Sequence, residues 1–145
     1  MNIHAMKPNP WMLIGLIAGA LSAPAQDAIP IPDWVIAGIA AVETGSLYQH
    51  GELVRYRDRR DGAAGEVGPW QLSPAALSDM GARKLRDRIR RDTILAESMT
   101  RAWLMRCFAH ASSWKEAVSL YHTGWSADHA DGFEYAERVY AAGRY

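Results

Sequence analysis

An apolar helix that ends in a glutamate is the feature that most constrains how this chain can fold. The run WVIAGIAAVETG, which closes at Gly45, is almost entirely apolar until Glu43. Pro32 disfavours an earlier helix start, Asp33 is the predicted N-cap, and glycine commonly follows the last helical residue. The pattern predicts a buried helix over residues 33–42 with a carboxyl group at its C-terminal edge.

The surroundings of Glu43 suit an acid catalyst. Apolar neighbours disfavour the ionised form of a carboxyl group and so raise its pKa. A carboxyl group that keeps its proton near neutral pH can protonate a leaving group. Taken alone, the same stretch also fits a glutamate that only ends a helix at the surface.

The N-terminal segment is typical of a secretory signal peptide rather than of a folded domain. Lys7 precedes the apolar stretch 11–21, and Ala-Pro-Ala at 23–25 matches a small-residue cleavage site. The apolar stretch is short for a membrane span, which needs roughly 20 residues. We therefore expect a signal peptide over 1–25, a mature domain over 26–145, and a periplasmic or secreted protein. The alternative is that the segment stays attached as an anchor.

Helical patterns dominate the rest of the chain, whose 145 residues point to a single, mainly α domain. The stretch Leu47–Val67 is the exception, because it is rich in Gly, Arg and Asp and has no helical period. It predicts a long irregular loop or a small β-hairpin after the first helix. The predicted later helices start at Ser73-Pro74, cover Arg83–Arg91 and Asp92–Ala109, run from the capping box at Ser113 to Gly124, and run from about Asp131 to Gly143.

The composition argues against several classes of function. The formal net charge is zero, so no bulk attraction to nucleic acid is expected. The basic run Arg83–Arg91 contains Asp87 and an apolar stripe, which favours a solvated helix face over a site for an anionic polymer. The histidines have no metal-binding spacing and no nucleotide fingerprint is present, so we expect neither metal nor cofactor. Cys107 lies in a helical pattern and is expected to be a small buried side chain.

Four short patterns follow one another along the chain and carry the main functional signal. In order along the sequence they are ETG at 43–45, GEVGPWQLSP at 65–74, AVSLYHTG at 117–124 and FEYAERVY at 133–140. Each pattern is weak by itself. The order, the spacing and the predicted export signal together make a stronger case.

These four patterns resemble the motifs of the lysozyme-like superfamily, which includes soluble lytic transglycosylases and goose-type lysozymes. The resemblance extends from about Trp34 to Tyr140 and implies a lysozyme-like helical domain. It also implies an enzyme that cleaves peptidoglycan at the β-1,4 bond between N-acetylmuramic acid and N-acetylglucosamine. The partners implied are peptidoglycan glycan strands and, given the small size, components of a secretion, conjugation or phage assembly apparatus.

The resemblance assigns roles residue by residue. Glu43 matches the catalytic acid, and Tyr135 matches a late tyrosine that lies near that acid. Thr44, Trp70 and His122 depart from the usual serine, methionine and asparagine. The implied substrate-binding residues are Thr44, Gly68, Trp70, Gln71, Tyr121, His122 and Tyr135. Sugar rings pack on aromatic faces, and we expect two of four rings to contact glycan, namely two among Tyr48, Trp70, Trp125 and Tyr135.

The reaction type stays open at the level of sequence. In lytic transglycosylases one carboxyl group protonates the bridging oxygen and then deprotonates the muramic 6-hydroxyl, which closes a 1,6-anhydro ring. A hydrolase uses a second carboxylate, for which Asp58, Asp61 and Glu66 in the loop are candidates. The transglycosylase is favoured. The alternatives are a lysozyme-type muramidase and a non-catalytic module that binds peptidoglycan or a secretion apparatus, which the departures at Thr44 and His122 motivate.

Overall fold

A computed structural model describes residues 29–125 and 129–144 of the chain. Ile31–Tyr145 form one compact unit, separate from Met1–Pro30. The predicted signal peptide over 1–25 and its cleavage point lie outside the described residues. In the part of the chain that is described, no helix is both long and apolar enough to cross a membrane.

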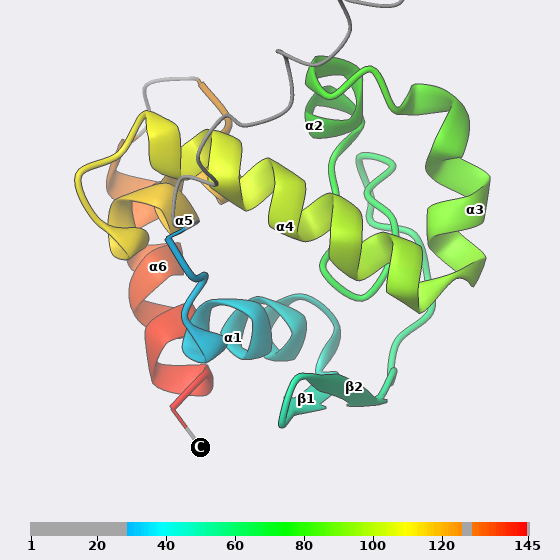
Figure 1. Ribbon diagram of the computed structural model, residues 1–145, viewed down its shortest axis with the longest axis horizontal. Coiled ribbons are helices and arrows are strands. Elements are labelled where there is room, and N and C mark those ends of the chain that lie inside the picture. The colour runs from blue at the N-terminus through cyan, green and yellow to red at the C-terminus, as the bar shows by residue number, and fades with distance from the viewer. Residues whose placement is uncertain (1–28, 126–128, 145) are drawn as a thin grey trace, which may run out of the picture. The chain divides into compact units, whose positions relative to one another are not determined.

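The compact unit is mainly helical and contains one small antiparallel sheet, as expected (Figure 1). The stretch predicted as a long irregular loop or a small β-hairpin contains both, a short hairpin over residues 47–55 and an irregular segment after it. The elements are α1 (Asp33–Thr44), β1 (Leu47–Gln49), β2 (Glu52–Arg55), α2 (Pro74–Asp79), the 3₁₀ helix η1 (Arg83–Leu85), α3 (Arg86–Arg91), α4 (Thr93–Ala109), α5 (Trp114–Thr123) and α6 (His129–Ala142).

Three helix contacts build the core: α1 packs on α6, α6 on α5, and α5 on α4 (Figure 1). The inner face of α1 is fully buried at Val35, Ile36 and Ile39. Gly38 lets α6 approach α1 closely, because a methyl group there would overlap the carbonyl of Val139. The close approach matters for function, since it brings the side chains of α6 to the C-terminal end of α1.

The limits of α1 differ from the sequence-based expectation at both ends. Pro32 occupies the N-cap position without a side-chain hydrogen bond, and Asp33 is the first helical residue rather than the cap. An acidic side chain in the first turn still interacts favourably with the helix dipole. The helix continues to Thr44, so Glu43 lies in its last turn, and Gly45 follows in the left-handed conformation with φ 62°.

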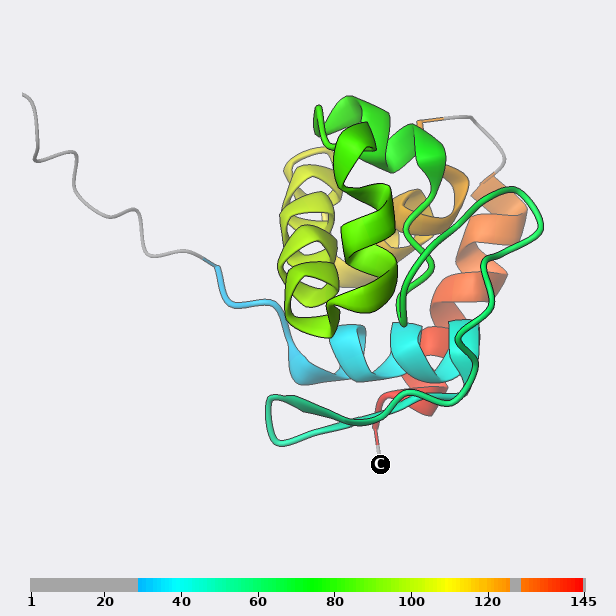
Figure 2. The ribbon, with the colours of Figure 1, turned by 90° about the vertical axis from the view of Figure 1, so that its right-hand side faces the viewer.

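The β1–β2 hairpin packs beside α1, and an irregular segment leads from it to α2. Tyr48 of β1 is buried, and its hydroxyl donates to Glu97 Oε1 (2.7 Å) and accepts from Arg101 of α4 (3.0 Å). Figure 2 shows the segment after β2 passing the C-terminal end of α1 before it turns back toward α2. The hairpin therefore holds the start of this segment close to the glutamate.

Two later helix starts were predicted correctly from the capping residues Ser73 and Ser113, whereas Asp92, expected as the first residue of its helix, is the N-cap. Ser73, Asp92 and Ser113 each accept a hydrogen bond from a backbone amide in the first turn of the next helix. The last helix begins at His129, two residues before the predicted start at Asp131.

The helical pattern of residues 92–109 predicts Ile94, Leu95, Met99, Trp103 and Phe108 as core residues, and this prediction is only partly correct for α4. Ile94 is 80% exposed, because it lies in the first turn of α4 on the side that faces solvent. Trp103 and Cys107 are buried as predicted, and Leu95, Met99 and Phe108 are partly buried against the core.

Candidate active site

Glu43 is partly buried at the end of α1 and is held by one strong hydrogen bond. The hydroxyl of Tyr135 on α6 donates to Glu43 Oε1 over 2.6 Å. Burial raises the pKa of Glu43 above its ordinary value, and the negative charge of Glu66 acts in the same direction. The Tyr135 hydrogen bond and the positive charge of Arg138 oppose this rise without cancelling it. Glu43 thus keeps its proton to a higher pH than a solvated glutamate does.

Tyr135 is fixed by its surroundings and not only by Glu43. Its side chain is almost completely buried, and burial raises the pKa of its hydroxyl well above the ordinary tyrosine value. The ring of His122 stacks flat on it, with ring centroids 4.2 Å apart and 9° between the planes. Arg138 lies over the same tyrosine ring at 5.7 Å. Tyr135 is therefore a rigid hydrogen-bond donor that remains protonated.

The GPWQ sequence forms a tight turn opposite Glu43. Val67 and Leu72 pair across its base through two backbone hydrogen bonds of 3.0 and 2.9 Å. Gly68 has φ 81° and packs against Ile89, so a side chain there would combine backbone strain with crowding. Gln71 also adopts a positive φ, 49°, which is uncommon for a residue other than glycine. The turn is therefore closed by backbone hydrogen bonds, and its shape depends on the positive φ angles of Gly68 and Gln71.

Three hydrogen bonds fasten this turn to the surrounding helices. Thr44 Oγ1 lies 2.9 Å from the Pro69 carbonyl oxygen, and Trp70 Nε1 donates to the Ile36 carbonyl over 3.0 Å. The buried Tyr121 of α5 donates its hydroxyl hydrogen to the Trp70 carbonyl over 2.5 Å. Glu43 belongs to α1 and the turn is hydrogen-bonded to α1, so the position of the turn relative to the glutamate is fixed.

These contacts correct the role predicted for Trp70. Its side chain is fully buried, so it cannot line a groove for sugar. It packs under the turn, where its ring also makes an edge contact with Tyr48. Tyr121 and Gly68 are likewise buried and shape the turn from behind.

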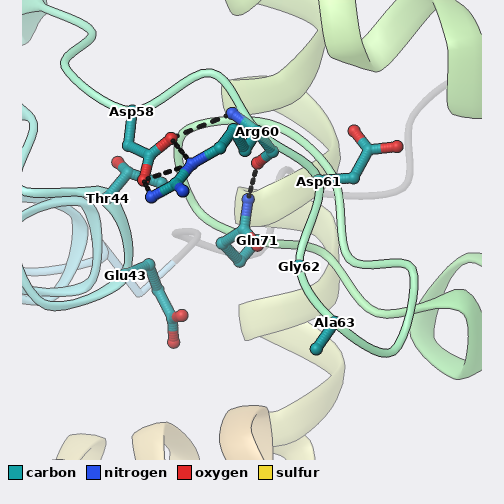
Figure 3. A pocket seen from close by; sticks show the side chains of 8 residues that line it. All are labelled: Glu43, Thr44, Asp58, Arg60, Asp61, Gly62, Ala63 and Gln71. Atoms are coloured by element: carbon teal, nitrogen blue, oxygen red, sulfur yellow. Dashed lines mark hydrogen bonds and ion pairs between the residues drawn. The ribbon is translucent and has the colours of Figure 1, made fainter.

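A pocket of about 350 Å³ opens between α1 and the loop that follows β2. In Figure 3 the α1 residues form one side, the loop residues form the other, and Gln71 lies between them. Gln71 Nε2 donates to the Gly68 carbonyl (3.0 Å) and the Arg60 carbonyl (3.4 Å), so the amide bridges turn and loop. The lining residues are Glu43, Thr44, Asp58, Arg60, Asp61, Gly62, Ala63 and Gln71.

Each of the two aspartates in the pocket wall forms an ion pair with arginine side chains. Asp58 accepts from the side chain and backbone amide of Arg60, which lowers the pKa of Asp58 to about 2. Asp61 is paired with Arg90 and Arg86, and these hydrogen bonds lower its pKa. Both carboxylates are therefore ionised at neutral pH, and Figure 3 shows Asp61 pointing away from Glu43 and Asp58 bonded to Arg60.

Glu66 is the third acidic residue of the loop. It does not line the pocket, and its Oε2 accepts from the Ala64 amide over 3.0 Å. Its charge is nevertheless close enough to raise the pKa of Glu43. Of the three loop carboxylates, Glu66 is the one that no described ion pair occupies.

The structure brings together some, but not all, of the predicted site residues. Glu43, Thr44 and Gln71 line the pocket, and Tyr135 and His122 lie behind Glu43. Among the four candidate rings, two of which were expected to contact glycan, only Trp125 is substantially exposed, at 49%, and it is bonded to Asp79 rather than placed in the pocket. The sequence interpretation missed the pocket residues Arg60, Gly62 and Ala63 and the charge of Arg138.

Within the described residues no group of three histidine, cysteine, aspartate or glutamate side chains could hold a metal ion. Comparison of the chain with models of protein families, with curated proteins and with solved structures gave no match. The function is therefore inferred from the geometry around Glu43 and from the motif resemblance.

Proposed function

We propose that this protein is a lysozyme-like, peptidoglycan-cleaving enzyme with Glu43 as its general acid and base. The observation that carries the proposal is a partly buried carboxyl group with a raised pKa at the edge of a pocket, oriented by Tyr135. Such a group can protonate a glycosidic oxygen near neutral pH. The predicted signal peptide would deliver the enzyme to the periplasm or the exterior, where peptidoglycan lies.

The chemistry of the pocket wall suits a sugar chain. Its polar groups include the Gln71 amide, the Thr44 side chain and the exposed guanidinium of Arg60. Amide and guanidinium groups can form hydrogen bonds with the hydroxyl and acetamido groups of a glycan. The hydrogen bonds within the turn hold these groups in place before substrate binds, which lowers the cost of ordering them.

The proposed reaction requires only one carboxyl group. Protonated Glu43 gives its proton to the bridging oxygen, and the bond from that oxygen to C1 of N-acetylmuramic acid breaks. The resulting carboxylate then takes the proton of the muramic 6-hydroxyl, and O6 bonds to C1 to form the 1,6-anhydro ring. Glu43 ends the cycle protonated, as it began.

The state of the loop carboxylates supports a lytic transglycosylase over a hydrolase. Asp58 is ion-paired with Arg60, and Asp61 is ion-paired with Arg86 and Arg90, so both carboxylates are engaged by cations rather than free to activate water. A lysozyme-type hydrolase is the second candidate, since Glu66 carries a charge close enough to act on Glu43.

Mass spectrometry of the products released from purified sacculi tests the proposal. We expect muropeptides with 1,6-anhydromuramic ends. Products with reducing muramic ends would replace the transglycosylase by the hydrolase. Binding to sacculi without any released product would contradict both and would favour a non-catalytic peptidoglycan-binding module.

Replacing the hydroxyl that holds Glu43 tests its orientation. Tyr135→Phe removes a hydrogen bond that lowers the pKa of Glu43, so this pKa should rise further. The alkaline limb of the pH–rate profile should move to higher pH, because the required acid stays protonated longer. The maximal rate should fall about tenfold, since the weaker acid is also less well placed.

Tyr140→Phe is the matched control on the same helix, because that ring contacts Trp34 and not the glutamate. Its pH–rate profile should equal that of the wild type. An unchanged alkaline limb in Tyr135→Phe would contradict the role assigned to the hydrogen bond.

A further inference from the structure

The loop that forms the outer wall of the pocket is fastened to α3 at two points, by the side chain of Asp61 and by the carbonyl of Gly65. Arg90 forms a two-pronged pair with Asp61, with Nε donating to Oδ1 (2.9 Å) and Nη2 to Oδ2 (2.6 Å). Arg86 donates to the same Oδ2 over 2.9 Å and also to the Gly65 carbonyl over 3.1 Å. Such a bidentate arginine–carboxylate pair within a network has a well-defined geometry.

The two arginines are themselves on a fixed support. The helix α3 is anchored by Ile89, which is fully buried and packs against Gly68 of the turn. The basic run that looked like a solvated helix face thus directs Arg86 and Arg90 at the pocket wall. From the inner side, the Gln71 amide donates to the Arg60 carbonyl of the same loop.

We propose that Asp61 is a positioning residue that keeps the outer wall of the Glu43 pocket in its substrate-binding shape through its ion pairs with Arg86 and Arg90. This inference rests on the proposed function for its kinetic part. Asp61 is immediately followed by Gly62 and Ala63, which line the pocket. Without the ion pairs of Asp61, the loop keeps its internal hydrogen bonds and, from outside, the bonds of Arg86 to the Gly65 carbonyl and of Gln71 to the Arg60 carbonyl.

Loss of the ion pairs of Asp61 should weaken substrate binding more than it slows the chemical step. Asp61→Asn should raise KM for soluble peptidoglycan glycan strands about fivefold and change kcat by less than about twofold. Arg90→Gln should reproduce this effect, and the double variant should add little, because both changes remove the same interaction. The difference from the wild type should shrink at high salt, which screens partly exposed ion pairs.

The chain supplies a matched control and a readout that needs no activity. Asp87→Asn removes the other carboxylate bound to Arg90 but leaves the pocket wall untouched. The loop contains the exposed trypsin sites Arg57, Arg59 and Arg60. Under native conditions trypsin should cut here about five- to tenfold faster in Asp61→Asn, because the rate follows the population of the opened loop. Asp87→Asn should be cut at the wild-type rate.

The two measurements separate this proposal from the proposed function. The proposed role of Asp61 as an anchor would be overturned if trypsin cut the wild type and Asp61→Asn at equal rates. It would also be overturned if trypsin cut Asp87→Asn as fast as Asp61→Asn. A fall in kcat without a change in KM would overturn the positioning role. If the wild type releases nothing from sacculi, the proposed function fails and trypsin cleavage still decides whether Asp61 fastens the loop.

Discussion

Glu43→Gln should abolish peptidoglycan cleavage, with a loss of roughly 10²- to 10⁴-fold in rate. Glutamine keeps the size of the side chain and can still accept the hydrogen bond of Tyr135, but it cannot donate and recover a proton. The fold should remain intact at neutral pH, because burial already disfavours the charged carboxylate. The loss is measured as release of soluble muropeptides, with circular dichroism to verify folding.

Glu134→Gln is the matched control for this change. Glu134 is an exposed neighbour of Tyr135 on α6, and its substitution should leave the rate unchanged. Cleavage by Glu43→Gln at a rate close to that of the wild type would remove Glu43 from the mechanism.

Trp70→Ala should cost about 3–5 kcal/mol in the free energy of unfolding. The ring is fully buried, and its Nε1 donates to the Ile36 carbonyl, so the substitution leaves a large cavity under the turn. Urea unfolding followed by circular dichroism measures the effect. Activity should fall because part of the protein is unfolded and because the turn is less well ordered in the part that stays folded.

Trp125→Ala is the control, since this second tryptophan is half exposed and should lose much less stability. A stable Trp70→Ala variant that had lost only its affinity for glycan would contradict the buried, supporting role of Trp70. It would restore the sugar contact that the sequence suggested.

Helix starts could be predicted where residues close in sequence determine them. Ser73, Asp92 and Ser113 cap helices in the structure. Each side-chain oxygen accepts a hydrogen bond from a backbone amide only two or three residues later, so the interaction is local in sequence. Asp33 failed as a cap because Pro32 occupies the N-cap position and the helix starts at Asp33 itself, one residue earlier than a capping aspartate there requires. Ile94 failed as a core residue because periodicity alone does not say which face of the first turn meets the neighbouring helices.

The site was predictable only as a set of parts. The resemblance pointed to Glu43 and Tyr135, but their hydrogen bond joins residues 92 positions apart, which no local pattern contains. The same resemblance placed Trp70 in the groove, although burial is a property of the whole fold. The loop wall around Arg60 was missed because its contact with Gln71 depends on where the chain returns after the turn.

The proposed mechanism requires that burial keeps a proton on Glu43 beside the pocket. An NMR titration of the Glu43 carboxyl carbon in the wild-type protein gives this pKa, with Glu43→Gln to assign the signal. We expect a pKa clearly above the ordinary glutamate value of 4.5, rising further in Tyr135→Phe. A pKa at or below 4.5 would contradict the proposed mechanism, because the group would then have lost its proton before it could donate one.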